Sequence, residues 1–476
     1  MRIGQTSFIT FISKFVSSIA GFVATILFAR LLGAEVLGTY YLLLSIVAWL
    51  ALVGTLGFES AITKRLSEGT DRGAYKIAGG LCIATLTSII VVVLILGEGF
   101  VVRLFSVQNI DYVVLLLLVG VAGTYVDSVL QGYHLVHIYA ILRPIRRVIR
   151  TILQVSGVLL SLGLLALVGG YAAGGIIVVL IGLFIIGGPY TLPGRHHFHS
   201  LFDYAKYAWM GRLEGKTFNQ ADILILGIFV PDSLVGIYGI TWSLANFLVI
   251  FSNAISSALF PELSKLSSED EYTQVASLVS DSMAYAGLFT IPGVVGGGLL
   301  SESLLRVYGP EFVEGARVLT ILIVAVLFYG YQRQTVNALS GIDRPDEAFT
   351  VNSVLIGSNV VLNIVLIANF GIIGAAVATA TSAVISLVTG YIILRRHVII
   401  SLPIRRIGTQ IIAATGMGVV VIVVEEIIKT ILPPTDVIVP TGLIVGVGAV
   451  SYFSFLWILS AEFREVVIEN APLISS

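Results

Sequence analysis

Apolar runs of about 20 residues follow one another along almost the whole chain, with short polar breaks between them. A helix of this length crosses the ~30 Å hydrocarbon core of a bilayer. Of the 476 residues, 57% are hydrophobic and only 12% are charged, whereas a soluble domain carries about 25% charged residues. The sequence therefore predicts an all-α polytopic membrane protein.

Fourteen spanning segments are predicted along the chain. They cover residues 10–32, 37–58, 74–97, 112–132, 147–168, 172–190, 206–230, 234–258, 275–298, 316–336, 348–368, 371–394, 406–427 and 438–459. If the N-terminus is cytoplasmic, all but five of the 27 Lys and Arg residues fall on the cytoplasmic side; the five are Arg30, Arg103, Arg306, Arg317 and Lys429. Because positive charge accumulates inside, we expect a cell-membrane protein with both termini in the cytoplasm.

Charge and cysteine content exclude several classes of partner and site. A formal net charge of -1 argues against nucleic acid as a partner. The single cysteine, Cys82, rules out a disulfide framework and a cysteine-based metal site. The first apolar run contains Lys14 and lacks a small-residue cleavage motif, so we expect it to be a spanning helix and not a cleaved signal peptide.

Short motifs recur after about 200 positions, which indicates an internal repeat. Gly38-Thr39-Tyr40 returns as Gly236-Ile237-Tyr238, and Arg143-Pro144 returns as Arg344-Pro345. Two further pairs, in the same order, are Arg65-Leu66-Ser67 with Lys265-Leu266-Ser267 and Arg103-Leu104-Phe105 with Arg306-Val307-Tyr308. Each copy holds six helices, so the copies should be related by an axis along the membrane normal. The predicted parts are a lobe at 1–195, a second lobe at 196–400, and two added helices with a tail at 401–476.

The two segments that open the repeats both carry positive charge. Arg212, Lys216 and Asn219 fall on one face of the segment 206–230, and the repeat pairs Arg212 with Lys14. A cation that faces lipid near mid-bilayer costs at least ~2.5–3.5 kcal/mol. We therefore expect these four residues to line a wet cavity between the lobes and to bind an anionic substrate, although long side chains at the cytoplasmic mouth could also snorkel to lipid phosphates.

Four carboxylates fall in or at the ends of predicted spanning segments: Glu59, Asp127, Glu214 and Asp222. An uncompensated charge is costly there. Each of the four is a candidate to bind H⁺ or Na⁺ and couple transport to an ion gradient, or alternatively to pair with a neighbouring helix. Beyond such an ion, we expect no cofactor.

Nucleotide hydrolysis is not expected. Gly211 and Gly215-Lys216-Thr217 resemble a phosphate-binding loop, but three residues separate the glycines where the loop needs four, and no strand precedes them. No Ser/His/Asp constellation stands out either, and the outward loops are too short for a membrane polymerase or ligase. The chain is therefore expected not to be an enzyme.

Two polar groups leave alternatives open. His196, His197 and His199 could bind a metal, but the nearest carboxylate in the sequence is Asp203, so a solvated interfacial loop is favoured and no metal site is predicted. Asparagines in the segments 234–258 and 348–368 could line a polar path for sugars, or form hydrogen bonds between helices.

Several local motifs resemble those of a known family. They are Ala29-Arg30-Leu31-Leu32-Gly33 followed by Gly38-Thr39-Tyr40, Pro261-Glu262-Leu263-Ser264, Tyr308-Gly309-Pro310-Glu311-Phe312, and the block from Asn359 to Thr379. The chain resembles the Wzx-like polysaccharide and lipid-linked oligosaccharide flippases of the multidrug/oligosaccharidyl-lipid/polysaccharide exporter superfamily. The resemblance covers nearly the whole chain.

This resemblance implies two six-helix lobes that alternate between inward-open and outward-open forms. It implies a polyprenyl or dolichyl phosphate-linked glycan as cargo, a functional link to glycosyltransferases, and ion-gradient coupling in at least some members. The sequence shows no dense cluster of cavity arginines, which argues against a peptidoglycan precursor as the cargo. The alternative is a cation-coupled multidrug exporter of the same superfamily.

Overall fold

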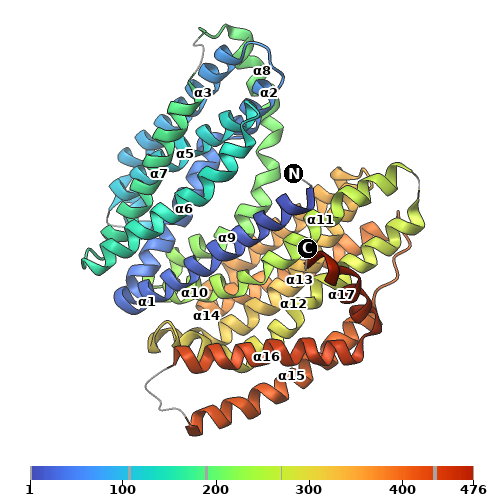
Figure 1. Cartoon of the computed structure of the whole chain (residues 1–476). Coiled ribbons are helices and arrows are strands. Elements are labelled where there is room, and N and C mark those ends of the chain that lie inside the picture. Colours follow the sequence, from blue (N-terminus) through green and yellow to red (C-terminus); the bar gives the residue numbers. More distant parts are fainter. Residues whose placement is uncertain (1–2, 106–108, 188–190, 270, 432–436, 475–476) are drawn as a thin grey trace. The chain divides into compact units, whose positions relative to one another are not determined.

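The structure is a computed structural model that describes the backbone of residues 3–105, 109–187, 191–269, 271–431 and 437–474. Side chains are described for the same residues except 3–20, 210–212, 214, 251, 254, 257–258, 466 and 469–474. Within these ranges the chain forms seventeen α-helices and one 3-10 helix, and no strand. Figure 1 shows the helices coloured along the sequence.

The chain divides into two compact units, Met1–Gly236 and Ile237–Ser476. The first unit holds α1 (Ile3–Thr55), α2 (Phe58–Ser67), α3 (Arg72–Leu96), α4 (Glu98–Phe105), α5 (Ile110–Gly132), α6 (Val136–Leu159), α7 (Leu164–Ile186), α8 (Arg195–Ala208), α9 (Met210–Phe229) and the start of α10 (Asp232–Phe247). The second unit holds the rest of α10, α11 (Val249–Ser268), α12 (Tyr272–Arg306), η1 (Pro310–Gly315), α13 (Ala316–Gly341), α14 (Pro345–Leu394), α15 (Ile404–Ile431), α16 (Ile438–Leu459) and α17 (Ala461–Ile474).

The predicted all-α polytopic architecture is confirmed. Among the described residues, nine helices are long and apolar enough to cross a membrane. Two of them, α1 and α14, each contain two predicted segments, because a glycine with non-helical backbone angles bends the helix between them. These glycines are Gly33 (φ 79°) in α1 and Gly371 (φ 56°) in α14, and positive φ is accessible to glycine at little cost.

The predicted segment 147–168 is wrong. Helix α6 begins at Val136 and ends at Leu159, and α7 begins at Leu164. Between them the chain turns through Ser161 (φ 60°) and Gly163 (φ 57°). Hydropathy misplaced the helix because it left Arg143 and Arg146 in a loop and put Arg147 and Arg150 at the start of a segment, whereas all four lie in the middle of α6.

Glycines bring α6 and α7 into close backbone approach within the first unit. A Cβ atom at Gly170 would lie 2.7 Å from the backbone nitrogen of Gln154, and one at Gly174 would lie 2.9 Å from that of Arg150. Small residues at such crossings allow helices in a membrane to approach closely. The crossing fixes the part of α6 that carries Arg150 and Gln154.

Gly38 of α1 and the start of α10 meet closely inside the first unit. A Cβ atom at Gly38 of α1 would lie 1.7 Å from the backbone oxygen of Asp232, and one at Gly236 of α10 would lie 1.9 Å from that of Ala34. Thr39 Oγ1 also donates to Asp232 Oδ2 at 2.5 Å. The contact is nearly reciprocal, because each of the two glycines meets the backbone of the other's helix.

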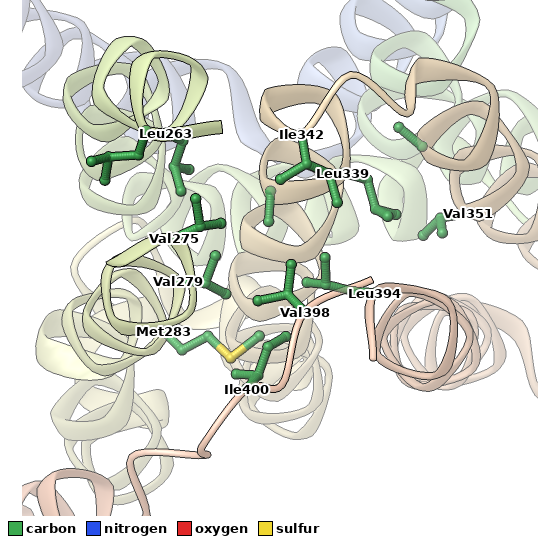
Figure 2. Close-up of a cluster of buried hydrophobic side chains, with 13 residues drawn as sticks. Leu263, Val275, Val279, Met283, Leu339, Ile342, Val351, Leu394, Val398 and Ile400 are labelled. Carbon is green, nitrogen blue, oxygen red and sulfur yellow. The ribbon is translucent and has the colours of Figure 1, made fainter. Parts of the chain in front are cut away.

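The second unit is built around α12 and α13. Figure 2 shows one apolar cluster in which Val275, Val279 and Met283, one turn apart on α12, face Leu339 of α13 and Leu394 of α14. A second cluster packs α15 and α16 onto α12, with Met417, Val421 and Tyr452 among its buried members. The two C-terminal spanning helices therefore belong to the same core as α12.

Candidate functional site

The predicted cationic site is only partly described. The side chains of Lys14 and Arg212 lie outside the described residues, so the expected pair of facing positive stripes stays a prediction. Lys216 is half-buried on α9, and so is Asn219, whose Nδ2 donates to the Gly215 oxygen of its own helix at 2.7 Å.

Helix α9 packs against the second arm of α1. Ser45 Oγ donates to the Gln220 backbone oxygen at 2.8 Å, and a Cβ atom at Gly227 would lie 2.3 Å from Leu42 Cδ1. Helix α9 therefore buries one side, which includes Thr217 and Asp222, and leaves Lys216 and Asn219 partly accessible. The repeat-opening segment 206–230 is thus held on the N-terminal helix.

The four candidate coupling carboxylates differ in environment. Glu59, in the first turn of α2, and Asp222, on α9, are buried with 1% and 4% exposure. Asp127 of α5 forms an ion pair with Arg146 of α6, Nη2 to Oδ1 2.8 Å. The side chain of Glu214 lies outside the described residues. The coupling role of these residues stays a prediction, and Asp127 has the interhelical partner that was the alternative.

An arginine face on α6 is the feature that sequence reasoning missed. Arg143 donates to the Tyr139 hydroxyl at 2.9 Å, Arg146 pairs with Asp127, and the Arg150 guanidinium lies over the Tyr171 ring, 5.0 Å from its centroid. One turn further, Gln154 Nε2 donates to the Tyr40 hydroxyl at 2.9 Å and to the Leu167 oxygen at 2.7 Å. The arginine face consists of these three arginines and Arg147, and it thus places four guanidinium groups within residues 143–150 of α6.

The opposite side of α6 is apolar and exposed. Ile141, Ile145, Val148 and Ile152 recur every three or four residues and are 37–59% exposed, which is the pattern of a helix with one lipid-facing side. This 3.6-residue period is present in the sequence. The mean hydropathy of the stretch does not reveal it, because the low values of the arginines offset the high values of the aliphatic residues.

The Arg150 guanidinium retains donors that the described residues do not use. Its Nε atom is buried and has no hydrogen-bond partner within the described part of the chain. Arginine presents five N–H donors in a planar fork that matches the oxygens of phosphate. The arginine face is therefore suited to bind a phosphorylated group.

The asparagines of α14 form a closed polar network between its two arms. Asn363 Nδ2 donates to Asn359 Oδ1 at 3.0 Å, and Asn359 Nδ2 lies 3.4 Å from both Thr379 Oγ1 and Ser382 Oγ. All four side chains have 1% exposure or less. Asn359 and Asn363 therefore form hydrogen bonds between the two arms of α14, which was one of the two roles predicted for the asparagines.

Comparison with known proteins identifies the family. The family model described as "Polysaccharide biosynthesis protein" matches residues 3–267, which is more than half of the chain. The chain belongs to this family. A second model, "Lipid II flippase MurJ", matches residues 225–439.

Two similar relatives come from Haloferax volcanii. The chain is 29% identical to "Probable flippase AglR" over 477 residues, covering 98% of each chain. It is also 29% identical to "Probable low-salt glycan biosynthesis flippase Agl15" over 391 residues, covering 82% of each.

Solved structures share the fold. "Lipid II flippase MurJ, inward closed conformation" aligns with a TM-score of 0.78 and 18% identity, covering 97% of this chain and 100% of that one. An inward-facing multidrug resistance transporter of the MATE family, in the MOP superfamily, aligns with a TM-score of 0.62 and 13% identity, covering 80% and 95%. These likenesses agree with the predicted all-α polytopic fold.

Proposed function

We propose that this protein is a flippase that moves a lipid-linked oligosaccharide from the cytoplasmic to the outer leaflet of the cell membrane by alternating access. The observation that carries the proposal is the similarity to a relative named as a probable flippase over 98% of both chains. The glycan class is supported by the family description and by the name of the second relative. Glycosyltransferases that assemble the glycan would supply the substrate on the cytoplasmic side.

The charge on the first unit supports an anionic headgroup. A phosphate or diphosphate faces a barrier of tens of kcal/mol in bare hydrocarbon. Lys216 on α9 and the arginine face on α6 supply cations on helices of the first unit, and such groups are costly within a membrane unless they serve a pathway or a pair. In this proposal they hold the phosphate while the isoprenoid tail stays in the lipid.

Ion coupling belongs to the same proposal. Glu59 and Asp222 are buried carboxylates in the first unit, and binding of H⁺ or Na⁺ would lower the cost of burying their charge. We expect the termini to be cytoplasmic, as the distribution of Lys and Arg indicates.

The multidrug exporter alternative has support only at the level of the fold, because the MATE structure is 13% identical. The arginine face would repel an organic cation, whereas it attracts a phosphate. Efflux of cationic drugs from a sensitive host would favour the alternative.

The test is translocation in proteoliposomes that contain a fluorescent polyprenyl-diphosphate oligosaccharide, scored by its accessibility to a membrane-impermeant quencher. Arg212→Ala with Lys216→Ala, and separately Arg150→Gln, should slow translocation about tenfold or more, since each lost charge-assisted contact is worth roughly 1.5 kcal/mol or more. The matched control is Arg395→Gln, because Arg395 also lies over a tyrosine ring, at 5.6 Å, but on an exposed helix end. Full translocation by both variants would contradict the assigned binding residues, and no translocation by the wild type would contradict the function.

A further inference from the structure

A histidine-aspartate cluster lies on the first unit, on elements other than α6. His196 and His197 stand in the first turn of α8, and Asp71 precedes α3. One ligating atom from each residue lies within 4.8 Å of those of the other two. The sequence favoured a solvated loop here with Asp203 as the nearest carboxylate; that expectation is wrong, because α8 packs against α2 and α3 and brings Asp71 to His197.

His197 is the fixed member of the cluster. It is 5% exposed, and its ring packs edge-on against Tyr75 at 4.7 Å. Its Nε2 atom is buried without a hydrogen-bond partner within the described residues and points to Asp71, 3.6 Å from Oδ2. Leaving such a polar atom without a partner costs about 1–3 kcal/mol. A ligand bound at Nε2 would remove that cost.

The other ring nitrogen of His197, Nδ1, lies against the backbone of Gly194. It accepts a hydrogen bond from the Gly194 N–H at 3.0 Å and lies 3.3 Å from the Gly194 oxygen. A ligand at Nε2 requires the other tautomer, in which Nδ1 carries the proton and donates to that oxygen, and the lone pair of Nε2 is then directed toward Asp71. A backbone carbonyl that accepts from the distal nitrogen is the usual support of a metal-bound histidine.

The side chain of Asp71 does not cap the helix that it precedes. It is the N-cap residue of α3, where an aspartate normally accepts a hydrogen bond from the helix and contributes about 1 kcal/mol. Here it has a left-handed conformation (φ 47°, ψ 33°) and its side chain makes no cap bond. The carboxylate is directed to His197 instead.

We propose that Asp71, His196 and His197 bind one zinc ion. Two imidazoles and one carboxylate are a ligand set typical of zinc, with bonds of about 2.0–2.2 Å and a fourth position for water. Calcium and magnesium prefer oxygen ligands alone. The ligating atoms must approach by roughly 1 Å to reach tetrahedral spacing, and His196 and Asp71 are exposed and can rotate to do so.

The bound ion would fasten the turn between α2 and α3 to the start of α8. Those elements already touch: Tyr75 donates its hydroxyl proton to Ser200 Oγ at 3.3 Å, and a Cβ atom at Gly57 would lie 2.5 Å from the Ala205 oxygen. Helix α8 leads directly into α9, which carries Lys216 and Asp222. The zinc would thus hold the base of the helix that carries part of the proposed substrate site.

Zinc binding is measured on the purified full-length protein in lipid nanodiscs. After treatment with a chelator, zinc chloride is titrated in competition with a chromophoric zinc indicator, and cobalt(II) absorption reports the coordination geometry. We expect one ion per chain with a tetrahedral cobalt spectrum. Asp71→Asn and His196→Ala should each weaken binding at least ~10-fold, since even loss of a supporting group costs about 10–100-fold.

The matched control is His199→Ala. His199 is exposed on the same helix but lies outside the cluster, with its Nδ1 atom 3.7 Å from Asp203 Oδ2. This variant should therefore bind zinc as the wild type does. Zinc should also raise the Tm of the wild type and leave that of Asp71→Asn unchanged. Absence of a single tight ion, or equal weakening in His199→Ala and His196→Ala, overturns the proposal. No transport is measured, so the result is independent of the proposed function.

Discussion

Replacing Gly38 by alanine puts a methyl group where the backbone of α10 already lies. The new Cβ would be 1.7 Å from the Asp232 oxygen and 2.5 Å from its carbonyl carbon. Carbon–oxygen contacts normally begin near ~3.3 Å, so the two helices must separate by roughly 1.5 Å. Overpacking against side chains costs about 1–3 kcal/mol, and here the obstacle is a backbone that cannot change rotamer.

Separation also lengthens the hydrogen bond from Thr39 to Asp232, and a bond to a charged group contributes about 1.5–3 kcal/mol. We therefore expect Gly38→Ala to lower the free energy of unfolding by about 3–5 kcal/mol. Thr39→Val removes the hydroxyl, which donates to Asp232 and also lies 3.2 Å from the Glu35 oxygen of its own helix, and should lose about 1.5–3 kcal/mol. The comparison separates the steric effect from the hydrogen bond.

The measurement is denaturant unfolding in mixed micelles, followed by tryptophan fluorescence. Gly120→Ala on α5 is the control, because its Cβ would meet nothing within 4 Å; alanine should there be neutral or stabilise the helix by up to ~1 kcal/mol. If Gly38→Ala unfolds like the wild type, or Gly120→Ala is equally destabilised, the close contact between Gly38 and the start of α10 is not present in the protein.

Three further predictions concern polar contacts between helices or helix arms. Arg146→Met should destabilise the protein by about 2–4 kcal/mol because Asp127 loses its partner, and adding Asp127→Asn should restore most of the loss in a double-mutant cycle; a double variant less stable than Arg146→Met would contradict the pairing. Gln154→Leu removes two interhelical hydrogen bonds and should cost about 1–3 kcal/mol, read from the same unfolding assay, with an unchanged value as the contrary result. Asn359→Leu should cost a similar ~1–3 kcal/mol, since Asn363 keeps a buried amide that loses its acceptor, and should leave a protein that resists denaturant less well than Asn369→Leu on the exposed end of the same arm.

The lengths of the apolar runs predicted most of the spanning helices, because a helix is formed by residues that are close together in the sequence. The bends at Gly33 and Gly371 divide long helices at the places where the predicted segments end. The prediction failed at α6, because Arg143 and Arg146 were assigned to a loop and Arg147 and Arg150 to the end of a segment, since an isolated charge is costly within a membrane helix. Asp127, the Tyr171 ring and the Tyr139 hydroxyl offset that cost, and two of these three belong to other helices.

The candidate sites also differ in whether their residues are close together in the sequence. Lys216 and Asn219 could be selected from one helical face, since a period of 3.6 residues relates positions a few residues apart. The arrangement of His196 and His197 beside Asp71 could not, because the carboxylate comes from a turn far away in the sequence. Among the residues close in sequence to these histidines, the nearest carboxylate is that of Asp203.

The sequence by itself determined that this chain is a bundle of membrane-spanning helices with recurring motifs in its two halves. In lipid each helix satisfies its own backbone hydrogen bonds, so apolar length and period are enough to specify it. The tertiary structure alone decided which charges are paired, that Gly38 touches the start of α10, and that Asp71 faces His197. Those contacts join distant segments, and their energies depend on distances of a few ångströms that no local pattern encodes.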